Sequence, residues 1–219
     1  MFPAFLILVC SFNNLFAQVK MNAGKIKFES TYPERKEENS SRAAAFLSPE
    51  EKTIYFKNGN TRTEIQTPLG RMISIYLAKT GETLTYSDKS NQTFAMKTTK
   101  ADIDNLKTEM GVRKPNVRLT NETKKIAGIN CMKAVVTYAN QQPYDVWYTT
   151  ELDAHNSSDT GIDGVEGFLM EFTTNGKKGV THTVCTSVEK MEVQDAMFML
   201  PPGYTTKTVN EIRNSTEMH

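Results

Sequence analysis

A charge excess of either sign is missing from this chain of 219 residues. Twenty-six Lys and Arg side chains stand against 25 Asp and Glu, so the formal net charge is +1 at pH 7. A domain that gathers nucleic acid by its overall field needs a large basic excess. The composition therefore excludes that mode of binding, and no nucleic-acid partner is predicted.

A hydrophobic run long enough to span a bilayer is also absent, since about 20 apolar residues are needed. The longest run covers residues 2–10 and ends in polar residues before a small one, Ala17. This is the anatomy of a signal peptide over residues 1–17. We expect cleavage near Ala17, which leaves a single periplasmic or secreted β-rich domain over residues 18–219. Any association of this domain with the membrane is expected to be peripheral.

Cysteine is scarce, with three in the whole chain. Cys10 lies within the predicted signal peptide, where lipid attachment is a further alternative. Cys131 and Cys185 remain in a compartment that permits disulfides. The sequence leaves two hypotheses open for them: a disulfide bridge between two strands, or two separate buried thiols.

Catalytic signatures are lacking as well. His182 and Cys185 stand three apart on a predicted strand, so their side chains point to opposite faces and cannot share a metal. No Gly-x-Ser-x-Gly elbow is present, and no histidine can be paired with a nucleophile. We therefore predict no enzyme, no cofactor and no metal site. A hydrolase that uses carboxylates such as Glu166 and Glu171 is kept as an alternative.

What the chain does contain is a series of short runs rich in Thr, Ile, Val, Tyr and Phe, separated by turn residues about every ten positions. Asn58-Gly59 is the strongest hairpin signal. One helix is predicted over residues 101–111, and a loop over 155–164. The segment 194–208 is expected to dock on the sheet, and the tail from about residue 209 is expected to be disordered.

Alternation along the predicted strands selects candidate core and cavity residues. The opposite faces of these strands are not cleanly polar, so the second face is expected to be covered by the helix or by a ligand. The candidate ligand-contacting residues are Ile73, Ile75, Leu77, Phe168, Met170 and Phe172. The same residues would also serve an ordinary core.

Five segments together resemble a family of exported proteins, mostly of Gram-negative bacteria, catalogued as a domain of unknown function. They are KIAGINCMKAVV (125–136), YDVWYTTEL (144–152), GFLMEF (167–172), SVEKMEV (187–193) and DAMFMLPPGY (195–204). More distantly, the chain is similar to the periplasmic lipoprotein carriers. That resemblance implies a mainly β fold, with a curved antiparallel sheet or open half-barrel and one or two helices covering its concave face.

Two functions follow as expectations. The first is a non-enzymatic binding protein that holds an apolar or lipid-like ligand in a cavity of the curved sheet. The alternative is a structural or interaction module of the cell envelope, which meets a protein partner through an edge strand or an apolar patch. The first requires an accessible cavity, whereas the second does not.

Overall fold

The computed structural model describes residues 20–31, 50–67, 70–88, 93–139, 141–157, 161–176 and 179–217. The signal peptide predicted over residues 1–17 lies outside the described residues.

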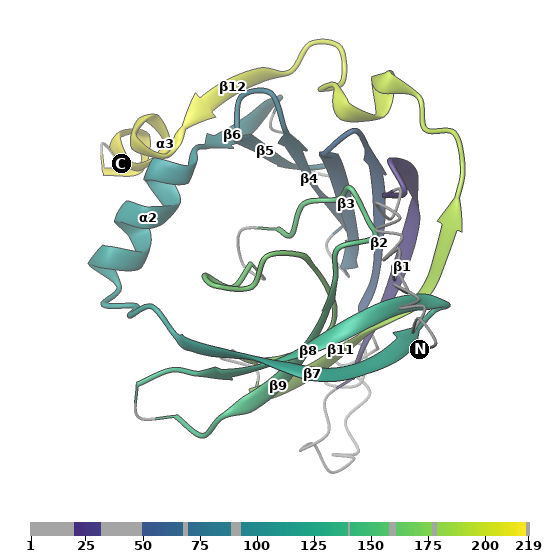
Figure 1. Ribbon diagram of the computed structural model, residues 1–219. Helices are drawn as coiled ribbons and strands as arrows, with labels where there is room; N and C mark the ends of the chain where they lie inside the picture. The colour runs from purple at the N-terminus through teal and green to yellow at the C-terminus, as the bar shows by residue number, and fades with distance from the viewer. Residues whose placement is uncertain are drawn as a thin grey trace, which may run out of the picture.

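One sheet of twelve strands makes up most of the described chain (Figure 1). Its order is β12-β6-β5-β4-β3-β2-β1-β11-β10-β9-β8-β7. The strands are β1 (Ala23–Thr31), β2 (Glu50–Lys57), β3 (Asn60–Thr67), β4 (Gly70–Leu77), β5 (Glu82–Ser87), β6 (Phe94–Thr98), β7 (Asn116–Ile126), β8 (Ile129–Thr137), β9 (Tyr144–Thr149), β10 (Phe168–Gly176), β11 (Gly179–Lys190) and β12 (Thr205–Thr208). The predicted mainly β class is confirmed, and β12 adds one parallel pairing, with β6.

The sheet curves strongly but stays open, with β7 and β12 at its two ends (Figure 1). Consecutive strands pair as hairpins along most of the order, because the turns between them are short. Asn58 and Gly59 carry φ angles of 49° and 78° between β2 and β3, the positive values that a two-residue hairpin turn requires. The hairpin predicted from Asn58-Gly59 is therefore confirmed.

The concave side of the curve holds the larger core. The connection between β9 and β10 runs inside the ring (Figure 1) and contributes Leu152 and Val165 to this core. Ile26, Phe28 and Phe168 from the strands pack with them. Phe28 and Phe168 have ring centroids 6.1 Å apart. An irregular segment, rather than a helix, thus fills much of the inner side.

A second core lies on the convex side, beneath the segment that follows β11. This segment runs along the outside of the sheet (Figure 1) and includes the short 3-10 helix η1 (Asp195–Phe198). Phe198 is buried against residues of β4, β5 and β6. Tyr204 meets Tyr86 of β5 edge to face, with centroids 5.1 Å apart. The docking of segment 194–208 on the sheet is confirmed.

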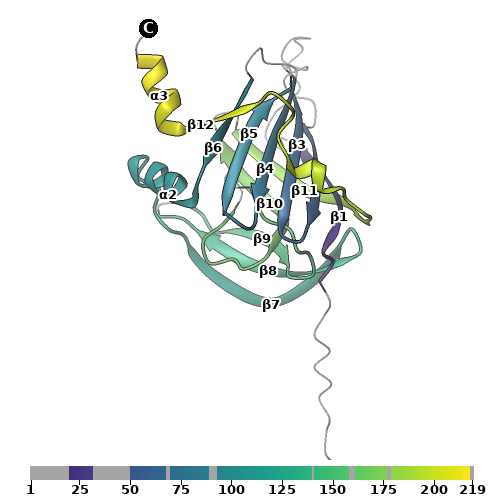
Figure 2. The same cartoon turned by 90° about the horizontal axis from the view of Figure 1, so that it is seen from above.

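Two helices stand at the open side of the ring (Figures 1 and 2). The predicted helix is observed as α2 (Lys100–Glu109), which begins at a capping box between Thr99 and Asp102. The expectation of disorder from residue 209 is wrong, because Val209–Glu217 forms helix α3. Glu211 accepts hydrogen bonds from the backbone and hydroxyl of Thr208 and so caps this helix. Among the described residues, no helix is long and apolar enough to cross a membrane.

Candidate functional site

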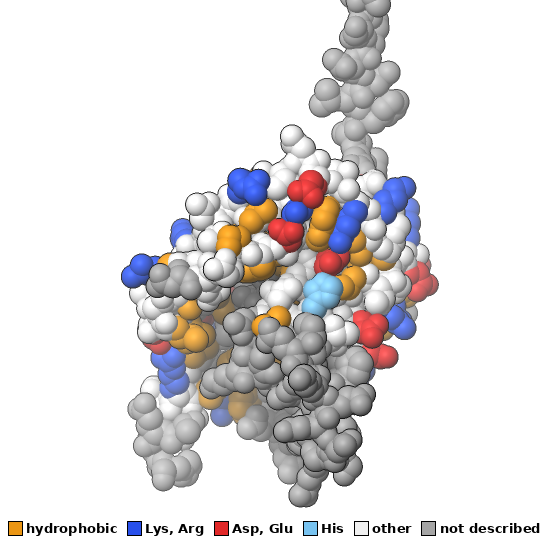
Figure 3. All heavy atoms as spheres, turned by 90° about the horizontal axis from the view of Figure 1, so that it is seen from below, with side chains coloured by type: hydrophobic (Ala, Val, Ile, Leu, Met, Phe, Trp, Pro, Cys, Tyr) orange, Lys and Arg blue, Asp and Glu red, His pale blue; other side chains and the backbone are white. Residues whose placement is uncertain are grey.

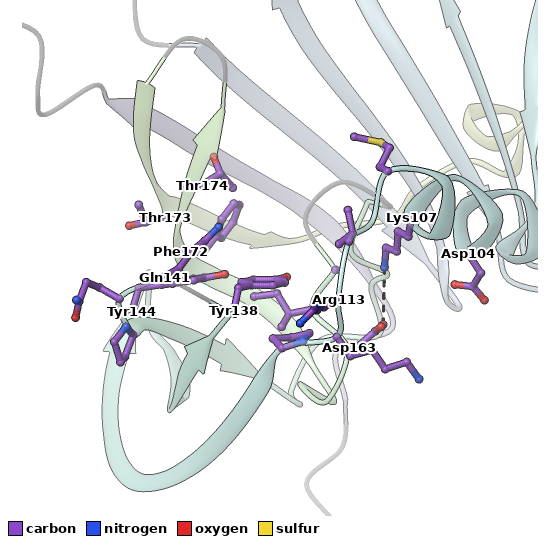
Figure 4. Close-up of a pocket in the computed structure, with 18 of the residues that line it drawn as sticks. Asp104, Lys107, Arg113, Tyr138, Gln141, Tyr144, Asp163, Phe172, Thr173 and Thr174 are labelled. Carbon is purple, nitrogen blue, oxygen red and sulfur yellow. Dashed lines mark ion pairs between the residues drawn. The ribbon is translucent and has the colours of Figure 1, made fainter.

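The described residues surround a hollow of about 1280 Å³ at the mouth of the curved sheet (Figure 4). One wall is the end of α2 and the segment that leads to β7. The other walls are the turn between β8 and β9, the hairpin of β10 and β11, and the connection between β9 and β10. The lining residues are Lys100, Asp104, Lys107, Thr108, Met110, Val112, Arg113, Lys114, Pro115, Tyr138, Gln141, Gln142, Pro143, Tyr144, Gly161, Ile162, Asp163, Phe172, Thr173, Thr174 and Val180.

Three aromatic rings line the inner wall of the hollow, those of Tyr138, Tyr144 and Phe172. Tyr138 and Tyr144 stack with centroids 6.4 Å apart and an interplanar angle of 11°. Burial raises the pKa of Tyr138, and it raises that of Tyr144 to about 12, so both phenols stay neutral near pH 7. Phe172 is buried and lies 6.4 Å from the ring of Phe28, measured between centroids. This wall therefore offers apolar surface with two hydroxyl groups.

Charged side chains occupy the outer rim. Lys107 of α2 lies 3.9 Å from a carboxylate oxygen of Asp163, the ion pair marked in Figure 4. Lys100 and Asp104 pair at 2.7 Å on the exposed side of α2. Figure 4 shows Arg113 extending toward the same space as the aromatic wall. The hollow thus has an apolar interior and a polar, mixed-charge entrance.

Only one of the six residues predicted to contact a ligand lines this hollow, namely Phe172. Phe168 and Met170 are buried in the concave core instead. Ile73 and Ile75 lie in the convex core under the C-terminal segment, and Leu77 packs against that core. Alternation identifies which residues share a face, but it does not tell which face of β4 is concave.

Three residues of the lining, Tyr138, Tyr144 and Arg113, were not predicted from the sequence. The two tyrosines flank the turn between β8 and β9, where Pro143 interrupts the strand pattern. Two aromatic residues at the facing ends of a hairpin are a usable signal, because cross-strand neighbours share a face. That the two tyrosines and Arg113 line the same hollow depends on the curvature of the whole sheet, which no local sequence pattern predicts.

A second polar cluster lies across β7, β9, β10 and β11, outside the hollow. Glu171 pairs with Lys124 at 2.5 Å and with His182 at 3.2 Å. The ammonium of Lys124 lies 4.3 Å from the ring centroid of Trp147. Glu171 is thus engaged by two neighbours, whereas Glu166 lies apart from it in the β9–β10 connection, exposed to solvent. No group of His, Cys, Asp and Glu that could hold a metal occurs in the part of the chain described here.

Charges of both signs are interspersed with apolar side chains on the face seen in Figure 3. The described surface there shows no large area of one sign. This distribution agrees with the near-zero net charge of the whole sequence.

Cys131 and Cys185 are free thiols in the structure, both buried in the concave core. Burial raises the pKa of the Cys131 thiol to about 11 and that of Cys185 to about 12. Such thiols are poor nucleophiles at neutral pH, since the thiolate is the reactive form. A bridge between them in the exported protein stays a prediction, and masses measured before and after reduction decide it.

The fold and the hollow define an open, strongly curved β-sheet domain with a cavity at its mouth. By its sequence the chain belongs to the family described as N-glycanase peptide, N-terminal domain, whose model matches residues 26–210. This finding replaces the resemblance to an exported family of unknown function, which is not confirmed.

Solved structures that share this fold include two of PNGF-II. PNGF-II in its P21 crystal form is 18% identical, with a TM-score of 0.55 over 88% of this chain and 32% of that chain. Its C2 form is 16% identical, with a TM-score of 0.52 over 89% of this chain and 32% of that chain. A weaker similarity, at 10% identity and a TM-score of 0.49 over 86% and 91% of the two chains, is to an uncharacterized conserved protein from Thermus thermophilus.

This chain therefore spans about a third of the length of the PNGF-II structures it matches. No curated protein matches the chain.

Proposed function

We propose that this chain is a non-enzymatic binding module that holds a lipid-like amphiphile in the hollow at the mouth of its sheet. The observation that carries the proposal is the hollow itself, a space of about 1280 Å³ among the described residues. In this proposal the module is exported after loss of residues 1–17, acts in the periplasm or outside the cell, and forms one domain over residues 18–219.

The size and lining of the hollow favour a large ligand with an apolar part. Typical small-molecule pockets measure roughly 300–1,000 Å³. Here Phe172, Ile162 and Val180 supply apolar surface beside the stacked tyrosines. An alkyl chain placed there would gain roughly 25 cal/mol for each Å² of apolar surface removed from water.

The polar entrance favours a ligand that also has a hydrophilic end. Gln141, Thr173 and Thr174 bring amide and hydroxyl groups to the lining, and Arg113 brings a guanidinium. A polar or anionic head group left near this entrance keeps its hydrogen bonds, whereas burial without partners costs several kcal/mol. The lining carboxylates, Asp104 and Asp163, are each paired with a lysine, which argues for binding rather than for acid-base chemistry.

A direct test of this proposal is a substitution that fills the hollow with a larger side chain. Thr174 is exposed to the hollow on β10, so Thr174→Trp places an indole where the ligand would lie without removing a core side chain. Thr186→Trp is the matched control, because Thr186 is an exposed strand threonine outside the lining. The readout is the titration of each protein with a fluorescent fatty acid.

We expect the Kd of the fatty acid to rise at least about tenfold in Thr174→Trp and to stay unchanged in Thr186→Trp; a tenfold change is about 1.4 kcal/mol. A free N-glycan serves as the comparison ligand, because the family description names an N-glycanase. Saturable N-glycan binding without fatty-acid binding would refute the lipid-like ligand and assign the hollow to carbohydrate.

The edge strand β7 favours a second candidate, an interaction module for an envelope protein. It is 11 residues long, pairs with β8 on one side only, and carries Leu119 with 58% of its surface exposed. Strands of this kind pair readily with a strand of another chain. Hydrogen exchange separates the two candidates, because an added strand protects β7 whereas a ligand in the hollow protects the turn between β8 and β9.

A further inference from the structure

We propose that the C-terminal end of α2 and the segment after it dock on an anionic lipid surface. The docking patch consists of Leu106, Met110, Val112, Arg113 and Lys114. This inference goes beyond the proposed function, because association with a lipid surface does not require an occupant in the hollow.

Exposed apolar side chains gather in this patch. None of the ten residues of α2, all of them described, is buried. The exposed fractions are 43% for Leu106, 69% for Met110 and 45% for Val112. Single exposed apolar residues are ordinary, but a contiguous group marks a surface that contacts a protein or a membrane.

The clustering is specific to this part of the chain. The described residues hold seven large apolar side chains with a third or more of their surface exposed, and three of the seven fall within residues 106–112. α2 stands at the open side of the ring beside α3 (Figure 2).

The positive charge beside the patch favours an anionic lipid surface as the partner. Lys100 and Lys107 already pair with carboxylates. Arg113 and Lys114 are exposed, and neither has an ion pair among the residues that the structure describes. Two cations without an ion pair, next to three exposed apolar side chains, complement an anionic head-group layer above an acyl interior.

The patch adjoins the hollow, since Met110, Val112, Arg113 and Lys114 also belong to its lining. Docking would therefore bring the mouth of the hollow against the lipid surface. Leu106 lies in the patch but not in the lining, so it separates docking from ligand binding.

The test is co-sedimentation of the purified protein with vesicles of phosphatidylcholine, with and without phosphatidylglycerol. The variant is Leu106→Asp, and the control is Met199→Asp, which changes a residue 66% exposed on the convex C-terminal segment. A third variant, Lys114→Gln, removes one of the two cations beside the patch.

We expect binding to vesicles that contain phosphatidylglycerol and a decrease as salt is raised. Lys114→Gln should lower the partition coefficient about fivefold, as expected for one cation near an anionic surface. Leu106→Asp should lower it further, about tenfold or more, whereas Met199→Asp should match the unmodified protein.

Equal binding to neutral vesicles, or an unchanged partition of Leu106→Asp, would overturn the proposal. A concentration-dependent dimer that Leu106→Asp abolishes would also overturn it and assign the patch to a second copy of the chain. Fatty-acid titration of Leu106→Asp in solution is read separately. If Leu106→Asp no longer binds vesicles but still binds the fatty acid, the result supports this inference. If the unmodified protein does not bind the fatty acid, the result counts only against the proposed function.

Discussion

Replacement of Phe172 by alanine tests the inner wall of the hollow. Phe172 is only 5% exposed, and its ring lies between two environments. One side packs in the concave core, with its centroid 6.4 Å from that of Phe28 and an interplanar angle of 59°. The other side lines the hollow. The substitution therefore removes both core packing and ligand-contacting surface.

The expected loss of stability follows from this position. Phe→Ala in an enclosed core costs about 3–5 kcal/mol, including the cavity that is left. Because the vacated space of Phe172 opens into the hollow, water can enter it, and we expect the lower end, about 3 kcal/mol. For a chain of this size each kcal/mol lowers Tm by roughly 2–4 °C, so the expected decrease is about 6–12 °C.

Urea unfolding followed by circular dichroism measures this loss, and fatty-acid titration measures the effect on the hollow. Leu119→Ala is the control, because that side chain is 58% exposed and should change stability by less than about 0.5 kcal/mol. A loss below about 1 kcal/mol for Phe172→Ala would refute the packing of this ring between the core and the hollow.

Three further predictions address the rest of the fold. Glu64→Ala should cost about 2 kcal/mol in urea unfolding, because it removes the carboxylate 2.6 Å from the mostly buried Arg62; an unchanged midpoint would show that the pair adds nothing. Gly24→Ala should cost at least about 1 kcal/mol, since its Cβ would lie 2.5 Å from a backbone carbonyl oxygen of β11; a stabilised variant would contradict this close approach. Burial raises the pKa of Cys131 to about 11 and that of Cys185 to about 12, from 9.0 for a thiol in the unfolded chain. Between these pH values both thiols stay protonated in the folded state, whereas the unfolded chain releases their protons. Stability of the reduced protein should therefore fall as pH rises from about 9 toward 11, and a urea midpoint that is flat in this range would contradict the buried thiols.

The sheet could be predicted from sequence because its signals are local. Alternating β-formers between turn residues define each strand, and Asn58-Gly59 fixes one hairpin by its positive φ angles. The helix followed from Ile103 and Leu106 at helical spacing, with Gly111 as a stop. Helix α3 was missed because its nine residues hold only two large apolar side chains, Val209 and Ile212, which are too few to mark a helix by periodicity.

The site could be predicted only in part, because the curvature of the sheet decides it. Ile75 and Phe172 both alternate with polar neighbours, yet the first lies on the convex side under the C-terminal segment and the second lines the hollow. Tyr138 is distant along the chain from α2, and Arg113 is distant from β10, yet all of them line the same hollow. Such contacts depend on how twelve strands curve together, which hydrophobic periodicity does not specify.

Native mass spectrometry of the protein recovered from its own envelope shows whether the hollow holds a ligand, with Thr174→Trp and Thr186→Trp prepared in parallel. We expect a discrete lipid-sized adduct on the unmodified protein and on Thr186→Trp, and its loss from Thr174→Trp, whose indole occupies the hollow. Bare protein in all three samples, or an adduct that persists equally in Thr174→Trp, would contradict a ligand held in this hollow.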